Sequence, residues 1–313
     1  MQNQNSVIPI IGLDLGNHNI KSSSGFICRS VCKEFNYSDE VNERGFIVYE
    51  GKKYVIGSGD FDHTKEKSRK LNTMPLFLYA LYKSLKVVST NVNVVIGLPL
   101  VQHQNKLLVK EMREKYKKSF GFQITTVYHD RTETIDVYYN VSNVIVFPEC
   151  VGAYYSLPTK IMSQDLLLVD IGGGTINLAL FLDEELQDFD TIPQGTNNVY
   201  SRIADAANEH NLGATFSVED IVRYMQFGQI IWEGVVDPMD YVDAIIDAFA
   251  LTIVNQIKRR HANYKAYKIL LSGGGAQIMN EALNRYITAT VIDNNLFANA
   301  IGFHLIGCEF YGY

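Results

Sequence analysis

The chain has 313 residues and a net charge of −6, with 47% hydrophobic and 20% charged residues. This length supports a well-buried core and suggests two domains, while the composition excludes a disordered chain. The acidic balance argues against direct, nonspecific binding to nucleic acid, because phosphate binding needs a positive surface.

The N-terminal segment MQNQNSVIPIIG has neither the basic residues nor the long apolar core of a signal sequence. No stretch reaches the roughly 18 apolar residues of a membrane span, and the polar first residues do not resemble an amphipathic anchor. The four cysteines, at positions 28, 32, 150 and 308, show neither metal-binding nor paired spacing. We therefore expect a cytoplasmic protein with reduced thiols and no membrane contact.

The first half of the sequence alternates between strand and helix patterns. We expect a strand at 7–16, a second strand from about residue 20, a hairpin at 45–59 that turns at Gly51, a helix at 75–85, a strand at 92–99, a helix at 102–118, and strands at 124–129 and 141–148.

The expected helix at 102–118 is strongly basic on its outer face. It is either an ordinary solvated helix or a contact for an acidic partner or neighbouring subunit. Its apolar face carries Leu108, Met112 and Tyr116, and its basic residues are Lys106, Lys110, Arg113, Lys117 and Lys118.

The second half begins like the first. A hairpin is expected over 166–181 and a helix at 198–209. A second helix is expected to begin after the Ser/Thr cap in TFSVEDIVRYM, and a third is expected at 240–260. A strand at 267–275 and a helix at 276–285 follow. In each half an apolar strand runs into Asp-x-Gly, at Asp14 and at Asp170, 156 residues apart. This likeness predicts two related domains, 1–157 and 158–297, facing each other across a cleft. The segment 298–313 is expected to pack on the first domain as a helix.

The first turn, DLGNHNIK, has the residues of a phosphate site. Gly16 lets successive backbone N–H groups converge on an anion, and Lys21 adds a point charge for a phosphate oxygen. Asp14 would repel phosphate and suits Mg²⁺ or its water ligands instead. Taken alone, however, Asp-x-Gly also occurs in ordinary turns, and His18 is either a phosphate contact or a surface histidine.

Two further glycine loops occur in the second half. In DIGGGT, the backbone amides of Gly173, Gly174 and Thr175 are open to a polyphosphate, and Asp170 again suits a metal ion. In Ser272-Gly273-Gly274-Gly275, glycines lie between a strand and a helix, where a flat ring or a phosphate can come close. One such loop is explained as a turn, but three loops, two of them in matched positions, favour a ligand.

Glu149 follows Pro148 at the expected start of a helix in FPECVGAYY. It is either a favourable partner of the helix dipole or, in a nucleotide cleft, a group that orients water for attack on a γ-phosphoryl group. The sequence contains no nucleophile elbow, Walker loop or H-E-x-x-H motif.

In this order and spacing, the segments IGLDLGNHNIK, PECVGAYY, DIGGGT, LLSGGGA and LFANAIGFHLIG resemble the actin-type ATPase superfamily, which also contains sugar kinases and heat-shock chaperones. The EGKKYVIG hairpin, the NTMPLFLYAL helix and the FANAIG ending are similar to bacterial plasmid-partitioning actins of the ParM type. The resemblance spans nearly the whole chain. It implies an α/β fold of the actin type, with two related domains that each have a mixed β-sheet flanked by helices, and a nucleotide cleft between them.

The resemblance also implies roles for individual residues. Asp14 and Asp170 would organise Mg²⁺ through water, and Asp170 and Glu149 would be catalytic, with Glu149 activating the hydrolytic water. Many relatives have an acid where this chain has Asn177, so no metal role is expected there. The nucleotide-binding residues would be Gly16, Asn17, Asn19 and Lys21 on one side, Gly172, Gly173, Gly174 and Thr175 on the other, Gly273, Gly274 and Gly275 behind the adenosine, and Gly195 near the phosphates or ribose.

The function implied is a filament-forming protein that binds and hydrolyses ATP, with GTP as a possible substitute, and that moves plasmid DNA through a DNA-binding adaptor. The alternative is a non-polymerising small-molecule kinase, or another ATPase, on the same core. Such kinases usually carry insertions that build a substrate pocket, and this sequence has no long insertion.

Overall fold

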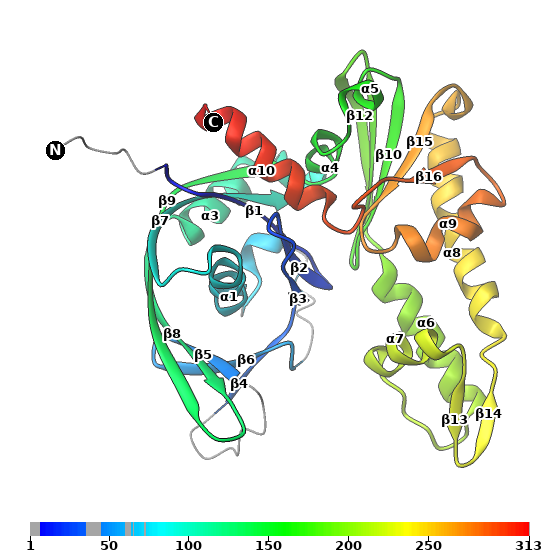
Figure 1. The fold of residues 1–313 in the computed structure, drawn as a ribbon. Coiled ribbons are helices and arrows are strands. Elements are labelled where there is room, and N and C mark those ends of the chain that lie inside the picture. The colour runs from blue at the N-terminus through cyan, green and yellow to red at the C-terminus, as the bar shows by residue number, and fades with distance from the viewer. Residues whose placement is uncertain (1–6, 36–44, 60–63, 65, 72, 313) are drawn as a thin grey trace. The chain divides into compact units, whose positions relative to one another are not determined.

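The computed structural model describes residues 7–35, 45–59, 64, 66–71 and 73–312. The chain divides into two compact units, shown in Figure 1. Unit 1 comprises Met1–Pro158 and Phe297–Tyr313, and unit 2 comprises Thr159–Leu296. Each unit has its own sheet and its own hydrophobic core, which is what defines a domain physically.

Unit 1 is built on a nine-stranded sheet with the order β3-β2-β1-β7-β9-β8-β5-β6-β4. Strand β1, between β2 and β7, is buried along its whole length, because apolar residues point to both of its faces. The strands are β1 (Ile10–Leu15), β2 (Asn19–Ser22), β3 (Ile27–Arg29), β4 (Cys32–Phe35), β5 (Gly45–Tyr49), β6 (Lys52–Ile56), β7 (Ser89–Leu98), β8 (Ser119–Val127) and β9 (Thr132–Pro148).

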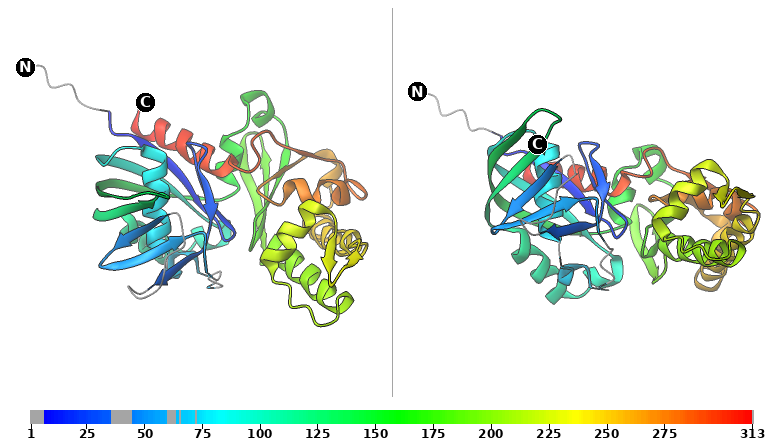
Figure 2. Two further views of the ribbon diagram at one scale, coloured as in Figure 1. Left: turned by 60° about the horizontal axis from the view of Figure 1, so that its bottom comes forward. Right: turned by 90° about the horizontal axis from the view of Figure 1, so that it is seen from below.

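The helices of unit 1 pack inside and outside a curled sheet. Helix α1 contacts β1, β2, β5 and β6, which are far apart in the strand order, and the sheet curls around it in Figures 1 and 2. The C-terminal helix α10 packs on β1, β7 and α4. The helices are α1 (Thr73–Leu85), α2 (Leu100–His103), α3 (Lys106–Tyr116), α4 (Val151–Tyr155) and α10 (Ala298–Tyr311), with the 3₁₀ helix η1 (Lys67–Arg69).

Unit 2 has a five-stranded sheet with the order β12-β11-β10-β15-β16 and a separate hairpin of two strands. The sheet strands are β10 (Leu166–Ile171), β11 (Ile176–Leu182), β12 (Glu185–Ile192), β15 (Lys268–Ser272) and β16 (Ala289–Val291), and the hairpin is β13 (Ile230–Trp232) and β14 (Val235–Asp237). The helices are α5 (Thr159–Met162), α6 (Thr196–His210), α7 (Val218–Phe227), α8 (Tyr241–Arg260) and α9 (Ala276–Asn284), with the 3₁₀ helix η2 (Tyr264–Ala266).

The two units share one strand arrangement. In unit 1, β3, β2 and β1 pair antiparallel, then β7 and β9 add in parallel. In unit 2, β12, β11 and β10 pair antiparallel, then β15 and β16 add in parallel. The related halves expected from the repeated Asp-x-Gly are therefore present in the topology.

Most expected elements are confirmed, but the basic helix is not continuous. Helix α2 ends at His103 and α3 begins after Asn105, whose side chain accepts a hydrogen bond from the Leu107 amide at 3.0 Å. Asparagine is a strong N-cap because its side chain satisfies such an amide, so Asn105 starts a new helix. The apolar face is buried as expected, at Leu108, Met112 and Tyr116.

The strand expectations were too short around residues 119–148 and incomplete elsewhere. Strands β8 and β9 form one long hairpin whose exposed positions are mostly polar, although Ile135 and Tyr138 are also exposed. The parts of these strands that were not expected therefore lack the continuous apolar run from which the shorter strands were predicted. The expected pattern also omitted strands that are short or carry exposed polar residues, namely β3, β4, β12, β13, β14 and β16. In the part of the chain that the structure describes, no helix has the length and apolar character needed to cross a membrane.

Candidate functional site

The first Asp-x-Gly turn joins β1 to β2. Asp14 pairs with Lys21 across this antiparallel hairpin, and the Lys21 ammonium lies 2.8 Å from Asp14 Oδ2. A Cβ atom on Gly16 would lie 2.5 Å from the carbonyl oxygen of Asn19. Gly16 is thus required by the closure of the turn itself, whatever binds there.

Two buried acids and two buried lysines meet beside this turn. The Lys67 ammonium, from η1, forms an ion pair with Glu149 and lies 3.8 Å from Asp14 Oδ1, while Lys21 pairs with Asp14. All four side chains are at most 11% exposed. Burial raises the pKa of Asp14, but the charges of Lys21 and Lys67 more than offset this, and its pKa lies below the ordinary value. Asp14 is therefore held as a carboxylate.

Glu149 lies between the end of β9 and the start of α4. Its amide donates to the carbonyl oxygen of Leu98 at 2.8 Å. The next turn is fixed by Asn299 of α10, whose Oδ1 accepts from the amides of Cys150 at 2.9 Å and Ala153 at 3.0 Å. Because Asn299 satisfies two amides at the helix start, it acts as a cap supplied by a distant part of the chain.

The glycine of the FANAIG segment lets α10 pack closely against α4. A Cβ atom on Gly302 would overlap the backbone of Gly152 in α4, so both helices need a small residue at this crossing. A Cβ atom on Gly97 would likewise lie 2.6 Å from the ring of Phe303. These contacts fix α4, and with it the position of Glu149.

The second Asp-x-Gly turn repeats the first turn's geometry. Asp170 pairs with Asn177 across the hairpin of β10 and β11, and Gly172 donates its amide to the carbonyl oxygen of Thr175 at 2.9 Å. A Cβ atom on Gly172 would lie 2.9 Å from that same oxygen. The acid, the glycine and the facing carbonyl residue each lie 156 positions after their counterparts in the first turn.

The other glycine loops of unit 2 pack directly on this second turn. A Cβ atom on Gly195 would lie 2.5 Å from Gly173, and the first amides of α6, from Thr196 and Asn197, donate to the carbonyl oxygens of Gly172 and Gly173 at 3.0 and 2.9 Å. These α6 amides hold the turn in place.

The loop after β15 packs against the second Asp-x-Gly turn as well. The Ser272 hydroxyl donates to Asp170 Oδ1 at 3.0 Å, and Gly273 adopts a φ of +85°, a conformation that favours glycine. The Gly275 amide donates to the Ile171 carbonyl oxygen at 2.9 Å.

The structure therefore brings the expected residues together in two groups, one in each unit. Unit 1 gathers Asp14, Gly16, Asn17, Asn19, Lys21 and Glu149, and unit 2 gathers Asp170, Gly172, Gly173, Gly174, Thr175, Gly195, Gly273, Gly274 and Gly275. Sequence reasoning missed Lys67, Lys70 and Asn299. Lys70 donates to Asn17 Oδ1 at 2.5 Å. No local motif marks the two lysines, whereas Asn299 lies inside the FANAIG segment.

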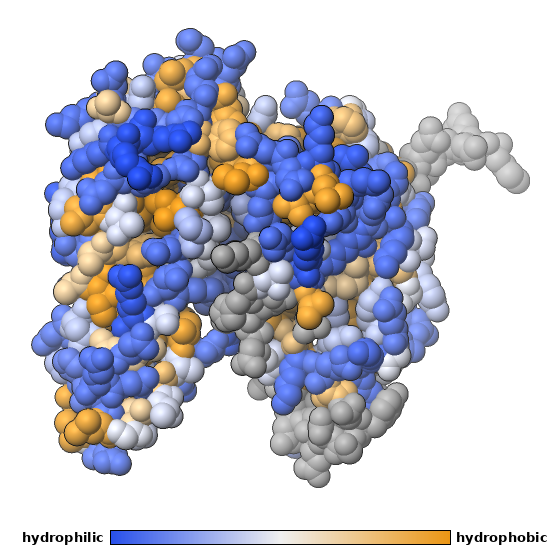
Figure 3. Space-filling view, turned by 180° about the vertical axis from the view of Figure 1, so that it is seen from behind, coloured by the Kyte–Doolittle hydropathy of each residue, from blue (hydrophilic) through white to orange (hydrophobic). Residues whose placement is uncertain are grey.

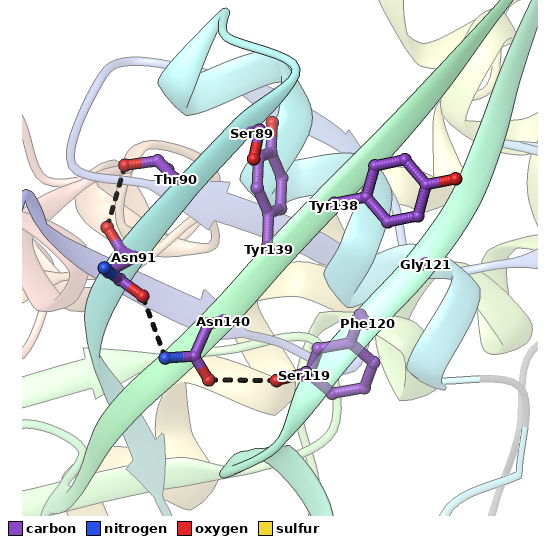
Figure 4. A pocket seen from close by; sticks show the side chains of 9 residues that line it. All are labelled: Ser89, Thr90, Asn91, Ser119, Phe120, Gly121, Tyr138, Tyr139 and Asn140. Atoms are coloured by element: carbon purple, nitrogen blue, oxygen red, sulfur yellow. Dashed lines mark hydrogen bonds between the residues drawn. The ribbon is translucent and has the colours of Figure 1, made fainter.

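A separate hollow lies on the sheet of unit 1. It has a volume of about 420 Å³ and is lined by the first residues of β7 and β8 and the middle of β9. Figure 4 shows Asn140 hydrogen-bonded to Asn91, at 2.9 Å, and to Ser119, at 3.0 Å. Its lining carries no charged side chain and none of the expected site residues, so it does not enter the chemistry below.

Comparison with known families covers both halves of the chain. Residues 12–152 match the model of the actin-like proteins' N-terminal domain, and residues 168–285 match the MreB-like C-terminal domain of archaeal actin homologues. This chain is an actin-like protein. Its fold is the actin-like α/β fold, as expected from the sequence.

Solved structures similar to this actin-like chain include filament-forming relatives. A non-polymerisable quadruple mutant of pCBH ParM is 21% identical, with a TM-score of 0.73, over 96% of this chain and 99% of that one. The archaeal actin homologue Ta0583 is 18% identical, with a TM-score of 0.78, over 96% and 100%. A 15-stranded ParM filament from Clostridium botulinum is 20% identical, with a TM-score of 0.72, over 96% and 99%. No curated protein sequence matches this actin-like chain.

Proposed function

We propose that this chain binds and hydrolyses ATP in a cleft between its two units and forms filaments whose stability depends on the bound nucleotide. The observation that carries the proposal is the duplicated Asp-x-Gly turn, with buried charges beside the first copy and glycine loops around the second. One related structure, of Ta0583, is a complex with ADP.

The residues present suit a magnesium nucleotide. Asp14 is kept ionised by its lysines, and Asp170 is a buried acid whose Oδ1 accepts a hydrogen bond from Ser272. Carboxylates that bind through water are the usual protein ligands of Mg²⁺ in nucleotide sites. The metal ion, when bound, would neutralise charge on the β- and γ-phosphates. Asp14 and Asp170 would hold its water ligands, one from each unit.

Glu149 would orient the attacking water. Its carboxylate is held by Lys67, and its backbone is fixed by Leu98 and by the Asn299 cap. A group that orients a nucleophile must be held to a fraction of an ångström, since small displacements cost large factors in rate. The buried, tethered position of Glu149 favours this role over that of a simple helix-dipole partner.

In the proposed site, backbone groups would bind most of the nucleotide. The first turn and Lys21 would contact phosphates from one side, and Gly172, Gly173, Gly174 and Thr175 from the other. The loop Gly273, Gly274 and Gly275, with no Cβ atoms, would lie against the adenosine, and Gly195 would support the second turn. ATP is the expected nucleotide, with GTP to be tested beside it.

Self-association is supported by the relatives and by one end of unit 2. Related structures include filaments of ParM and of Alp12. In this chain, the end formed by α7 and the β13–β14 hairpin exposes large apolar side chains, visible as orange groups in Figure 3. Such patches mark association surfaces. The exposed residues are Leu212, Phe227, Ile231, Val235 and Val236.

We also propose that the filament moves plasmid DNA in the cytoplasm through a small DNA-binding adaptor. The net charge of −6 disfavours direct binding to DNA. The decisive experiment is sedimentation and electron microscopy of the purified protein with ATP, GTP, ADP and no nucleotide. Filaments with a triphosphate and their loss in ADP are expected; protein that stays soluble at high concentration under all four conditions would refute polymerisation.

A further inference from the structure

The first turn collects buried lysines. Among the described residues, the buried lysines are Lys21, Lys67 and Lys70, and each contacts the first turn or its acids. Burying an ammonium group costs several kcal/mol unless partners compensate. Three of them in one place indicate a use for positive charge there that stability alone does not explain.

Lys67 and Lys70 come from one short segment, and its geometry directs both to the same side. The 3₁₀ helix η1 has about three residues per turn, so side chains three positions apart lie one above the other. Lys67 reaches Glu149 and Asp14, and Lys70, at the end of η1, reaches Asn17 in the first turn. One segment thus delivers two cations to two points of the candidate phosphate site.

The opposite side of this segment is fastened to α3. The Ser68 hydroxyl donates to Glu111 Oε2 at 3.0 Å, and the Arg69 guanidinium donates to both Glu111 oxygens at 3.3 and 3.2 Å. The Lys115 ammonium donates to the carbonyl oxygens of Ser68 at 3.1 Å and Lys70 at 2.8 Å. These contacts hold the backbone while the two lysines project into the site.

Lys67 has the capacity to touch a phosphate without leaving Glu149. An ammonium group has three N–H donors, and its described partners are one oxygen of Glu149 and, at 3.8 Å, one of Asp14. A terminal phosphate placed beside these acids would be repelled by them unless a cation lay between. Lys67, which lies against both carboxylates, is a cation available at this point.

We propose that Lys67 recognises the terminal phosphate of the nucleotide and, in the same contact, fixes the Glu149 carboxylate relative to it. This inference rests on the proposed nucleotide site. Lys70 supports the inner phosphates through the first turn. Lys67 is a positioning residue for Glu149, and it makes the site prefer the triphosphate over the diphosphate.

The test compares affinities for a non-hydrolysable ATP analogue and for ADP, each with Mg²⁺, at protein concentrations too low for polymerisation. In Lys67→Met, the preference for the triphosphate is expected to fall about 10- to 100-fold, the size of a lost charge-assisted hydrogen bond. Lys70→Met is expected to weaken both ligands alike. Lys110→Met, which removes an exposed lysine of α3, is the matched control and should change neither affinity.

The double variant Lys67→Met/Glu149→Gln distinguishes a direct contact between Lys67 and the phosphate from an effect of Lys67 on the charge of Glu149. It removes one positive and one negative charge together, so the net charge of the buried cluster is unchanged and the variant can be tested if Lys67→Met alone does not fold. A triphosphate preference that stays low in the double variant supports the proposal. A preference restored to the wild-type value, or unchanged in Lys67→Met, overturns it. Wild-type protein that binds no nucleotide would instead refute the proposed function.

Discussion

Asn299 links the C-terminal helix to Glu149, and replacing it by alanine tests that link. The Asn299→Ala variant loses both hydrogen bonds to the buried amides of Cys150 and Ala153. Asn299 is only 6% exposed, and the close crossing of α10 and α4 at Gly302 leaves little space for water to replace it. Each buried amide left without a partner costs about 1–3 kcal/mol. The expected destabilisation for two amides is therefore roughly 2–6 kcal/mol.

The measurement is thermal unfolding of the nucleotide-free protein, with ATP hydrolysis measured on the same samples. For a domain of this size, each kcal/mol shifts Tm by about 2–4 °C, so the Tm of the unfolding transition of unit 1 should fall by roughly 4–24 °C. Hydrolysis should slow below the unfolding temperature, because the turn after Glu149 is no longer fixed. Asn255→Ala, at an exposed position of α8, is the control and should shift Tm by no more than about 2 °C. A Tm for Asn299→Ala that matches this control would show that the cap does not stabilise α4.

Three further substitutions test the proposed function. Glu149→Ala should keep nucleotide binding but slow hydrolysis by about 10²–10⁴-fold, so that filaments persist in electron micrographs; wild-type turnover would remove Glu149 from the mechanism. Asp170→Ala should weaken magnesium-dependent binding and hydrolysis, measured by titrating Mg²⁺ at fixed ATP, and an unchanged magnesium dependence would count against it. Ile231→Asp, on the exposed end of unit 2, should reduce the pelleted fraction with ATP while nucleotide affinity stays constant; normal pelleting would place the filament contact elsewhere.

The fold was predictable where one residue pattern determines local structure. Apolar runs such as Leu166–Ile171 form fully buried strands, and the Ser217 cap begins α7, with its hydroxyl accepting from the Asp220 amide at 3.2 Å. Patterns failed where tertiary context decides. The polar segment β12 forms a strand because it pairs with β11. Its own sequence gives little indication of a strand.

The same distinction applies to the candidate site. Motif residues such as Asp14 and Asp170 were identifiable because their position after a buried strand is encoded locally. Lys67 was not, because its role depends on an ion pair with Glu149, 82 positions further along the chain. The anchoring of η1 on α3 and the hydrogen bond from the Lys67 amide to Gln102 Oε1, at 3.0 Å, bring the two together, and no spacing rule describes such contacts.

The two Asp-x-Gly turns share a backbone arrangement but differ in the charge of the residue that faces the aspartate. Lys21 faces Asp14 across the first hairpin, whereas Asn177 faces Asp170 at the corresponding position of the second. Asn177 accepts a hydrogen bond from Thr191 at 2.9 Å and brings no positive charge. The ammonium groups of Lys21 and Lys67 lie 2.8 and 3.8 Å from the Asp14 oxygens, and such groups attract phosphate oxygens. If both turns bind one nucleotide, the Asp14 side, with its lysines and Glu149, should therefore contribute more to recognition of the phosphates and to hydrolysis than the Asn177 side.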